Sequence, residues 1–223
     1  MSKIVIFGGG MIAEEAYYYL TADSPHEIVA FTVDGSFITK NELFGLPIIP
    51  FEEIEKKYPS HQFKMFVAIG YQNLNKLRAT KYHEAKDKGY ELTSYVSSRA
   101  SNFGDVEIGD NCFILENQAI QPCSKIGNNV TIWSGNHIGH HSAIGDHCFI
   151  TSHVVISGNT TIEPYCFIGV NASIGHGITI GRESIIGAGS IITKNVEPKS
   201  VYIAQDTPKY KLDSATFLKF TKL

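Results

Sequence analysis

The C-terminal half of the chain carries an apolar residue at every sixth position. An α-helix repeats its apolar face about every 3.6 residues and an alternating strand repeats it every two, so neither element produces a period of six. Short strands joined by tight turns do produce it, because each hexapeptide can form one side of a triangular prism. The repeated isoleucines are Ile108, Ile114, Ile120, Ile126, Ile132, Ile138, Ile144, Ile150, Ile156, Ile162, Ile168, Ile174, Ile180, Ile186 and Ile192.

With three hexapeptides to a coil, the pattern predicts a left-handed parallel β-helix of about five coils. The position two residues before each isoleucine is mostly small, and we expect it to share the interior with the isoleucine. Cys112, Cys148 and Cys166 fall on that position, whereas Cys123 is out of phase and is expected to face outward. The register is unbroken from Ile108 to Ile192, so no inserted loop is predicted between them.

Before residue 98 the pattern is different. Strand-like apolar runs alternate with helical stretches, which favours a parallel, Rossmann-like α/β sheet. We therefore predict an α/β nucleotide-binding domain over 1–98, the β-helix over 99–205 and a tail over 206–223. The expected strands cover residues 3–7, 27–33, 46–49, 63–69 and 91–96, and the expected helices follow residue 10 and cover 51–58 and 73–88.

The first strand ends in a glycine cluster that is typical of phosphate binding. Gly8, Gly9 and Gly10 stand between the strand and a helix, where glycine lets a phosphate approach the backbone amides of the helix N-terminus. Asp34 ends the second strand and is placed to accept a hydrogen bond from a ribose or a base. A domain of this size is too small for a two-halved dinucleotide fold, so we predict a mononucleotide or a nucleotide-sugar.

Composition narrows the class of protein. The formal net charge is −3, which argues against nucleic acid as the main partner. No apolar run is long enough for a transmembrane helix, and the first residues lack the apolar stretch of a signal peptide, so we expect a cytoplasmic protein without membrane insertion. The four cysteines contain no CxxC pair, and we expect no metal.

Histidines gather in the repeats, where they are the candidate acid–base residues. His140 and His141 follow Ile138 by two and three positions and should lie on the outer surface. Near them, His137, His147 and His153 are expected to be solvated side chains without a chemical role.

The chain resembles the bacterial hexapeptide acyltransferases that acetylate nucleotide-linked amino sugars or O-acetylate sialic acid. The resemblance rests on the repeats, on Phe7–Gly10 with Asp34, on the strand end Val67–Gly70, and on the segment Ile138–Asp146. It implies an acetyl-CoA-dependent N-acetyltransferase of bacterial surface-glycan (O-antigen or polysaccharide) biosynthesis.

In that family the histidine that matches His140 is the general base, and the next residue is commonly an acid that orients it. Here the next residue is His141, so Asp146 or a carboxylate of a neighbouring subunit becomes the candidate for that role. The family also binds coenzyme A in a groove between two prisms of a homotrimer. The positions that match are Gly158, Val170, Ala188 and Lys209 for the coenzyme, and Gly8, Gly9, Gly10, Asp34 and Gly70 for the nucleotide-linked amino sugar.

Three alternatives stay open at this point. The first is O-acetylation of a sugar or a sialic acid. The second is a γ-type carbonic anhydrase with zinc between subunits, for which His140 and His176 have the family spacing while the third ligand position is Gly181. The third is a non-catalytic β-helix that binds a nucleotide. The end of the chain, from Leu212, is expected to form a short helix against the prism end or a neighbour.

Overall fold

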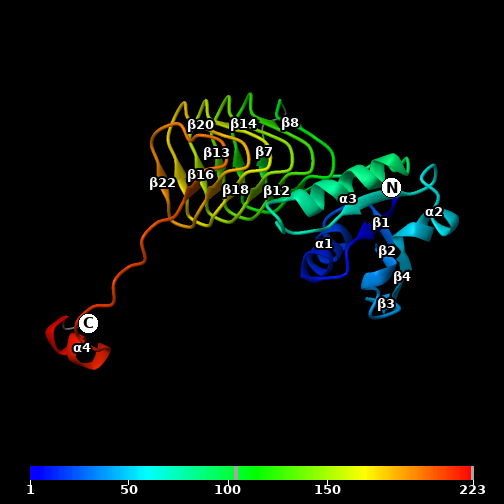
Figure 1. Ribbon diagram of the computed structural model, residues 1–223, viewed down its shortest axis with the longest axis horizontal. Coiled ribbons are helices and arrows are strands. Elements are labelled where there is room, and N and C mark those ends of the chain that lie inside the picture. The colour runs from blue at the N-terminus through cyan, green and yellow to red at the C-terminus, as the bar shows by residue number, and fades with distance from the viewer. Residues whose placement is uncertain (103–104, 222–223) are drawn as a thin grey trace.

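An α/β domain and a β-helix follow one another along the chain in the computed structural model, which describes residues 1–102 and 105–221 (Figure 1). The first domain contains a five-stranded sheet in the order β3-β4-β2-β1-β5. Strands β4, β2, β1 and β5 are parallel and only the edge strand β3 is antiparallel, as the alternating pattern predicts. Its strands are β1 (Lys3–Phe7), β2 (Glu27–Val33), β3 (Glu42–Leu43), β4 (Leu46–Pro50) and β5 (Lys64–Val67).

The helices of this domain cover both faces of the sheet. Helix α1 packs through Ala13, Ala16 and Leu20, which are fully buried. The helix expected over 51–58 is shorter than predicted, because a 3-10 turn precedes a single α-helical turn. The helical elements are α1 (Met11–Ala22), η1 (Gly35–Phe37), η2 (Phe51–Glu53), α2 (Ile54–Lys57) and α3 (Lys76–Asp87).

The β-helix is a prism with three flat faces, each a parallel sheet of two-residue strands. The first face contains β7 (Ser101–Asn102), β10 (Ala119–Ile120), β13 (His137–Ile138), β16 (Val155–Ile156), β19 (Ser173–Ile174) and β22 (Ile191–Ile192). The second contains β8 (Glu107–Ile108), β11 (Lys125–Ile126), β14 (Ala143–Ile144), β17 (Thr161–Ile162) and β20 (Thr179–Ile180). The third contains β6 (Tyr95–Val96), β9 (Phe113–Ile114), β12 (Thr131–Ile132), β15 (Phe149–Ile150), β18 (Phe167–Ile168), β21 (Ile185–Ile186) and β23 (Val201–Tyr202). The fold class is the one that the repeats predict.

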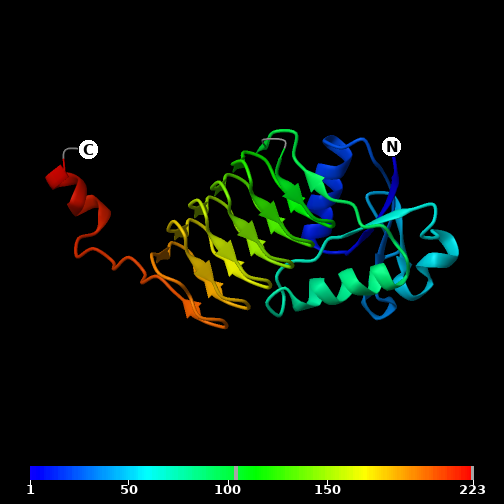
Figure 2. The ribbon, with the colours of Figure 1, turned by 90° about the horizontal axis from the view of Figure 1, so that it is seen from above.

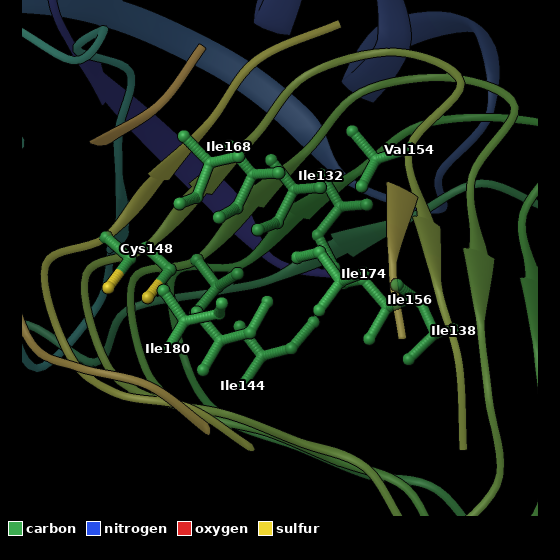
Figure 3. Packing of buried hydrophobic residues seen from close by; sticks show 14 of the residues in the cluster. Ile132, Ile138, Ile144, Cys148, Val154, Ile156, Ile168, Ile174 and Ile180 are labelled. Atoms are coloured by element: carbon green, nitrogen blue, oxygen red, sulfur yellow. The ribbon is translucent and has the colours of Figure 1, made fainter. Parts of the chain in front are cut away.

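Isoleucines from successive coils lie directly above one another. Ile120 pairs with Ile138, and Ile138 pairs with Ile156 on the next coil. Their side chains fill the prism from all three faces, as Figure 3 shows for part of the cluster. The small residues share the interior with the isoleucines, as expected: Cys112, Cys148 and Cys166 are completely buried. The thiol of Cys148 also reaches the carbonyl of Glu163 on the next coil at 3.2 Å.

The strand expected over 91–96 is only two residues long, and it belongs to the prism. Tyr95 in β6 pairs with Phe113 in β9, whereas Leu92 makes a single bridge to Met65 of the first sheet. The pairing of the β-helix therefore begins at Tyr95, and with β7 and β23 it extends beyond the repeats that the isoleucines reveal. Tyr95 and Phe113 also join one buried cluster with Phe66 of the sheet, so the two domains share a continuous apolar core.

The corners between the faces repeat as regularly as the strands. We call the turns from the first to the second face the first corner, those from the second to the third face the second corner, and those from the third to the first face the third corner. Every sixth residue from 111 to 189 has a positive φ, a conformation that favours glycine and asparagine. These residues are Asn111, Asn117, Cys123, Asn129, Gly135, His141, His147, His153, Asn159, Tyr165, Asn171, Gly177, Glu183 and Gly189.

The α/β domain covers the third face and the corners beside it. From helix α3, Tyr82 donates a hydrogen bond to Asp110 at the second corner, and from α1, Tyr19 donates one to Glu116 at the third corner. Arg78 of α3 is buried and donates to the carbonyls of Asn129 and His147, again at the second corner. The first corner lies on the opposite side of the prism.

The tail does not pack on its own prism over the residues that the structure describes, 206–221. Helix α4 (Ser214–Thr221) stands apart from the β-helix at the end of an extended segment (Figures 1 and 2). Contact with the prism end, one of the two expected arrangements, is therefore not made by the described residues of the tail. Cys123 is exposed, as predicted. Among the residues described, no helix has the length and apolar character needed to cross a membrane.

Candidate functional site

His140 stands at the first corner on a backbone that is fixed to the coils on either side. Its N–H donates to Oε1 of Gln121 at 2.9 Å, and its carbonyl accepts from the N–H of Asn159 at 2.8 Å. Gly139 before it lies against the backbone of Gly158, where an added Cβ would overlap the chain. The neighbouring coils therefore hold the histidine in place while its exposed side chain points away from the prism.

The imidazole of His140 has one occupied and one available nitrogen. Its Nδ1 lies 3.1 Å from Nδ1 of His141, so one of the two nitrogens carries the shared hydrogen and the other accepts it. The ring itself covers Gly158: a Cβ at that position would lie 2.7 Å from Nε2 of His140. Glycine at 158 thus makes room for the ring, and the hydrogen bonds of the described residues include none to Nε2.

His141 is the residue whose side chain contacts the ring of His140 within the chain. It occupies the positive-φ position of the corner, with φ 58°, which turns its ring back toward His140. Asp146, the sequence-based candidate for this role, lies at the second corner instead. Its Oδ1 accepts a hydrogen bond from the backbone N–H of Asn128 at 2.7 Å, so it does not take part in the first corner.

A third histidine shares the corner. The ring of His176 lies 6.2 Å from that of His140, measured between centroids, with Gly158 on the coil between them. Sequence reasoning considered His176 only as a zinc ligand. The third position of that zinc pattern, Gly181, has no donor side chain and lies at the second corner. The described part of the chain contains no group of three histidine, cysteine or acidic side chains placed to bind a metal.

His147 was expected to be solvated, and this prediction is wrong. The side chain is buried under the docked α/β domain, where Nδ1 lies 2.9 Å from Nδ2 of Asn129 and the ring contacts those of His83 and Tyr165. Burial lowers the pKa of His147 to about 4, because removal from water disfavours the charged ring. His147 is thus a neutral structural residue at neutral pH.

The glycine cluster lies at the carboxyl edge of the first sheet, and its glycines have two distinct roles. Gly8 is required for packing, since a Cβ there would lie 2.6 Å from the carbonyl oxygen of Ala68 and 3.0 Å from Cβ of Ala13. Gly9 and Gly10 instead line a pocket of about 190 Å³ beside the N-terminus of α1. The first-turn amides of a helix favour anions, so this pocket suits a phosphate.

Lys40 and Phe37 line the same pocket, and sequence reasoning missed both. Lys40 is exposed and adds a positive charge to the pocket, which would suit a phosphate group. Phe37 is 72% exposed, which is unusual for phenylalanine and leaves its ring free to stack on a flat ligand such as a nucleobase. Both lie in the segment between β2 and β3. Its sequence has no periodic pattern, so nothing in the sequence pointed to these two residues.

Asp34 follows β2 at this edge, as expected, but it is already paired. Its Oδ1 accepts from Nζ of Lys81 in α3 at 2.8 Å. Partial burial acts to lower the pKa of Lys81, but the contacts with Asp34 and Glu84 outweigh it and raise that pKa. These residues line a second, open cavity of about 620 Å³ with Phe51 and Glu52.

Gly70 is buried at the same edge, and its carbonyl accepts a hydrogen bond from Arg78 at 3.0 Å. The expected coenzyme positions are spread over the prism rather than gathered in one chain. Gly158 is at the first corner, whereas Val170 and Ala188 are exposed at the third corner. Lys209 is exposed in the segment that leads to α4. A single chain therefore does not bring these four positions together.

Comparisons with known proteins agree with the hexapeptide repeats and with the two-domain fold. Residues 123–158 and 159–194 match the family model described as bacterial transferase hexapeptide (six repeats). No curated protein matches the chain significantly. The fold is similar to that of PerB from Caulobacter crescentus, solved with CoA and GDP-perosamine, at a TM-score of 0.81 and 24% identity over 92% of this chain and 95% of that one.

A second similar structure is the acetyltransferase domain of PglB from Neisseria gonorrhoeae, solved with acetyl coenzyme A. Its TM-score is 0.78 at 20% identity, over 91% of this chain and 96% of that one. WeeI from Acinetobacter baumannii is more distant, with a TM-score of 0.60 and 18% identity over 92% and 97% of the two chains. At these identities the likeness shows that the α/β domain and the β-helix form a shared two-domain fold.

Proposed function

We propose that the chain is an acetyl-CoA-dependent N-acetyltransferase. Residues 123–194 of its β-helix match repeats of the bacterial transferase hexapeptide type. Its substrate would be an amino deoxy sugar linked to a nucleotide, made for a bacterial surface glycan. The observation that carries the proposal is the arrangement of His140, with Nδ1 held by His141 and Nε2 open above Gly158.

That arrangement suits a general base. A sugar amine attacks the thioester carbon through its lone pair and must lose a proton as the new N–C bond forms. Nε2 of His140 can accept this proton in the tautomer in which Nδ1–H of His140 donates to Nδ1 of His141, and the ring is fixed over Gly158. The backbone N–H of a nearby corner residue can stabilise the oxyanion that forms at the same time.

The α/β domain would bind the nucleotide. Gly9, Gly10 and Lys40 present amides and a cation to a diphosphate, and Phe37 presents a ring to the base. Gly8, Asp34 and Gly70 shape the same sheet edge through packing, an ion pair and a hydrogen bond. Binding energy from the nucleotide would then position the reacting amine, which itself offers few contacts.

A homotrimer would bring these two parts together. The α/β domain covers the third face, whereas His140 is at the opposite corner of the prism. The amine of a sugar bound in one α/β domain would therefore meet His140 of a neighbouring subunit. Pairing of a first corner with a neighbour's third corner would also bring Gly158 near Val170 and Ala188, the positions expected to contact coenzyme A. Relatives with this fold are solved with CoA or acetyl coenzyme A.

The test is release of free thiol from acetyl-CoA in the presence of UDP-, dTDP- and GDP-linked amino sugars. His140→Ala should lower kcat by at least about a hundredfold. His61→Ala is the control, because His61 is an exposed histidine of the α/β domain. Reaction with a hydroxyl sugar alone would establish O-acetylation instead, and nucleotide binding without thiol release would establish a non-catalytic protein.

Subunit sharing needs its own experiment. Trimers that mix His140→Ala chains with Lys40→Ala chains should regain activity, because some interfaces then combine an intact base with an intact nucleotide pocket. Activity in the mixture no higher than in either variant would contradict a site shared between subunits. Light scattering of the unmixed protein reports the trimer directly.

A further inference from the structure

His176 has no part in the mechanism proposed above, although it faces the same space as His140. The two residues are two coils apart at the first corner, and both side chains are exposed. Gly158 separates them and contributes no side chain, so the rings approach to 6.2 Å between centroids at an interplanar angle of 53°. The corner therefore presents two imidazoles on opposite sides of one small gap.

The proposed reaction moves two protons at two places. One leaves the amine as the N–C bond forms, and His140 accepts it. The other must reach the sulfur when the C–S bond of the tetrahedral intermediate breaks, because the departing group is a thiolate. An alkyl thiolate is a strong enough base that a proton donor at this position assists its departure.

We infer that His176 is the general acid that donates this second proton to the coenzyme sulfur. This inference rests on the proposed function. The expected coenzyme positions Val170 and Ala188 belong to later coils than His140, so the thioester would reach the gap from the side of His176. His176 begins the step protonated and gives its proton to sulfur, while neutral His140 takes one from the amine.

The two histidines end the step with their protonation states exchanged. His140 then carries one proton more and His176 one fewer, and the sum of protons, charges and bonds is conserved. A water molecule between rings at this separation can return the proton from His140 to His176, which restores the starting state. In the described structure His141 already occupies Nδ1 of His140, which leaves Nε2 for this exchange.

The test compares the ratio of variant to wild-type kcat for two acetyl donors whose thiols differ in how well they leave. With acetyl-CoA, His176→Gln should lower kcat by about a hundredfold, the scale of acid–base assistance. With the acetyl thioester of an acidic aromatic thiol, whose thiolate needs no proton to leave, the same variant should lose less than about threefold. His140→Ala should be impaired with both donors, because the amine still has to lose its proton.

A residue that only shapes the gap would behave differently. An equal loss with both donors, or no loss with acetyl-CoA, would overturn the inference while wild-type activity upholds the proposed function. A wild-type protein that releases no thiol from either donor would overturn both. His61→Ala is the control, since His61 is an exposed histidine of the α/β domain and not of the prism. It should retain activity, and thermal melting should show all variants folded.

Discussion

Arg78 joins the two domains with a buried charge, and its removal should loosen their contact. The side chain is 1% exposed and donates to four backbone carbonyls at 3.0 to 3.3 Å: one in Gly70 and three at the second corner. The hydrogen bonds shown for the described residues include no carboxylate partner for it. Arg78→Met keeps most of the apolar stem and removes every donor.

Two opposing effects set the size of the loss. The carbonyl of Cys148 also accepts from Thr131, so three carbonyls lose their donor, each at about 2 kcal/mol for a buried unsatisfied group. Burial acts the other way, since it lowers the pKa of Arg78 to about 10 and so disfavours the cation by roughly 3 kcal/mol. The lost hydrogen bonds outweigh the relieved charge, and we expect a net destabilisation of about 3 kcal/mol.

Urea unfolding followed by circular dichroism and by fluorescence measures this difference. Trp133 is the single tryptophan and packs against the cluster that the two domains share, so its emission reports on docking. Lys76→Met is the control, because Lys76 is half exposed and its ion pair with Glu183 should be worth at most about 1 kcal/mol. If Arg78→Met unfolds within about 0.5 kcal/mol of the wild type, the reasoning about the four carbonyls is refuted.

Three further predictions concern the prism. His147 has a pKa of about 4 when folded, below the ordinary value of about 6.5, so between these values the unfolded chain binds a proton that the folded chain does not, and stability falls by roughly 3 kcal/mol as the pH drops through that window. His147→Asn, which suits the positive φ, should flatten this pH dependence in urea melts from pH 7 to pH 4. An unchanged slope would assign the pH dependence to other groups. Cys123→Gly should raise the free energy of unfolding by about 1 kcal/mol, because an exposed non-glycine residue there has φ 62°; a lower melting temperature would contradict this. Ile150→Ala should cost about 3 kcal/mol in denaturant titrations, whereas Ile191→Ala, 76% exposed, should cost less than about 1 kcal/mol, and equal losses would show that the repeated position is not the interior one.

The sequence predicted the prism well because its information is local and repeated. Each isoleucine is specified within six residues, and the same rule recurs at every coil, so the interior, the small position of Cys148 and the exposure of Cys123 could all be anticipated. The burial of His147 could not be, since it depends on α3 docking at the second corner. The pairing of Asp34 with Lys81 likewise joins residues 47 positions apart.

The closeness of His140 and His176 was available from the sequence, but their spacing was interpreted only as part of a zinc pattern. They are separated by two coils of three hexapeptides, so the period that reveals the fold also places them at one corner. The orientation of His140 by His141 had a weaker signal, because it depends on the positive φ at the sixth-residue position. The pocket residues Phe37 and Lys40 had none, since the loop after β2 follows no pattern.

Because the coils pair regularly, the length of the β-helix changes by a fixed height for each coil. A single inserted residue within it would shift every later isoleucine off the interior, whereas the gain or loss of one complete coil would keep all of them inward. Such a change would move His140 by the height of one coil, about 4.8 Å, relative to the end of the prism and leave its surroundings at the corner intact. The length of the prism beyond His140 is thus adjustable in whole coils, while the contacts of His140 with the coils on either side are preserved.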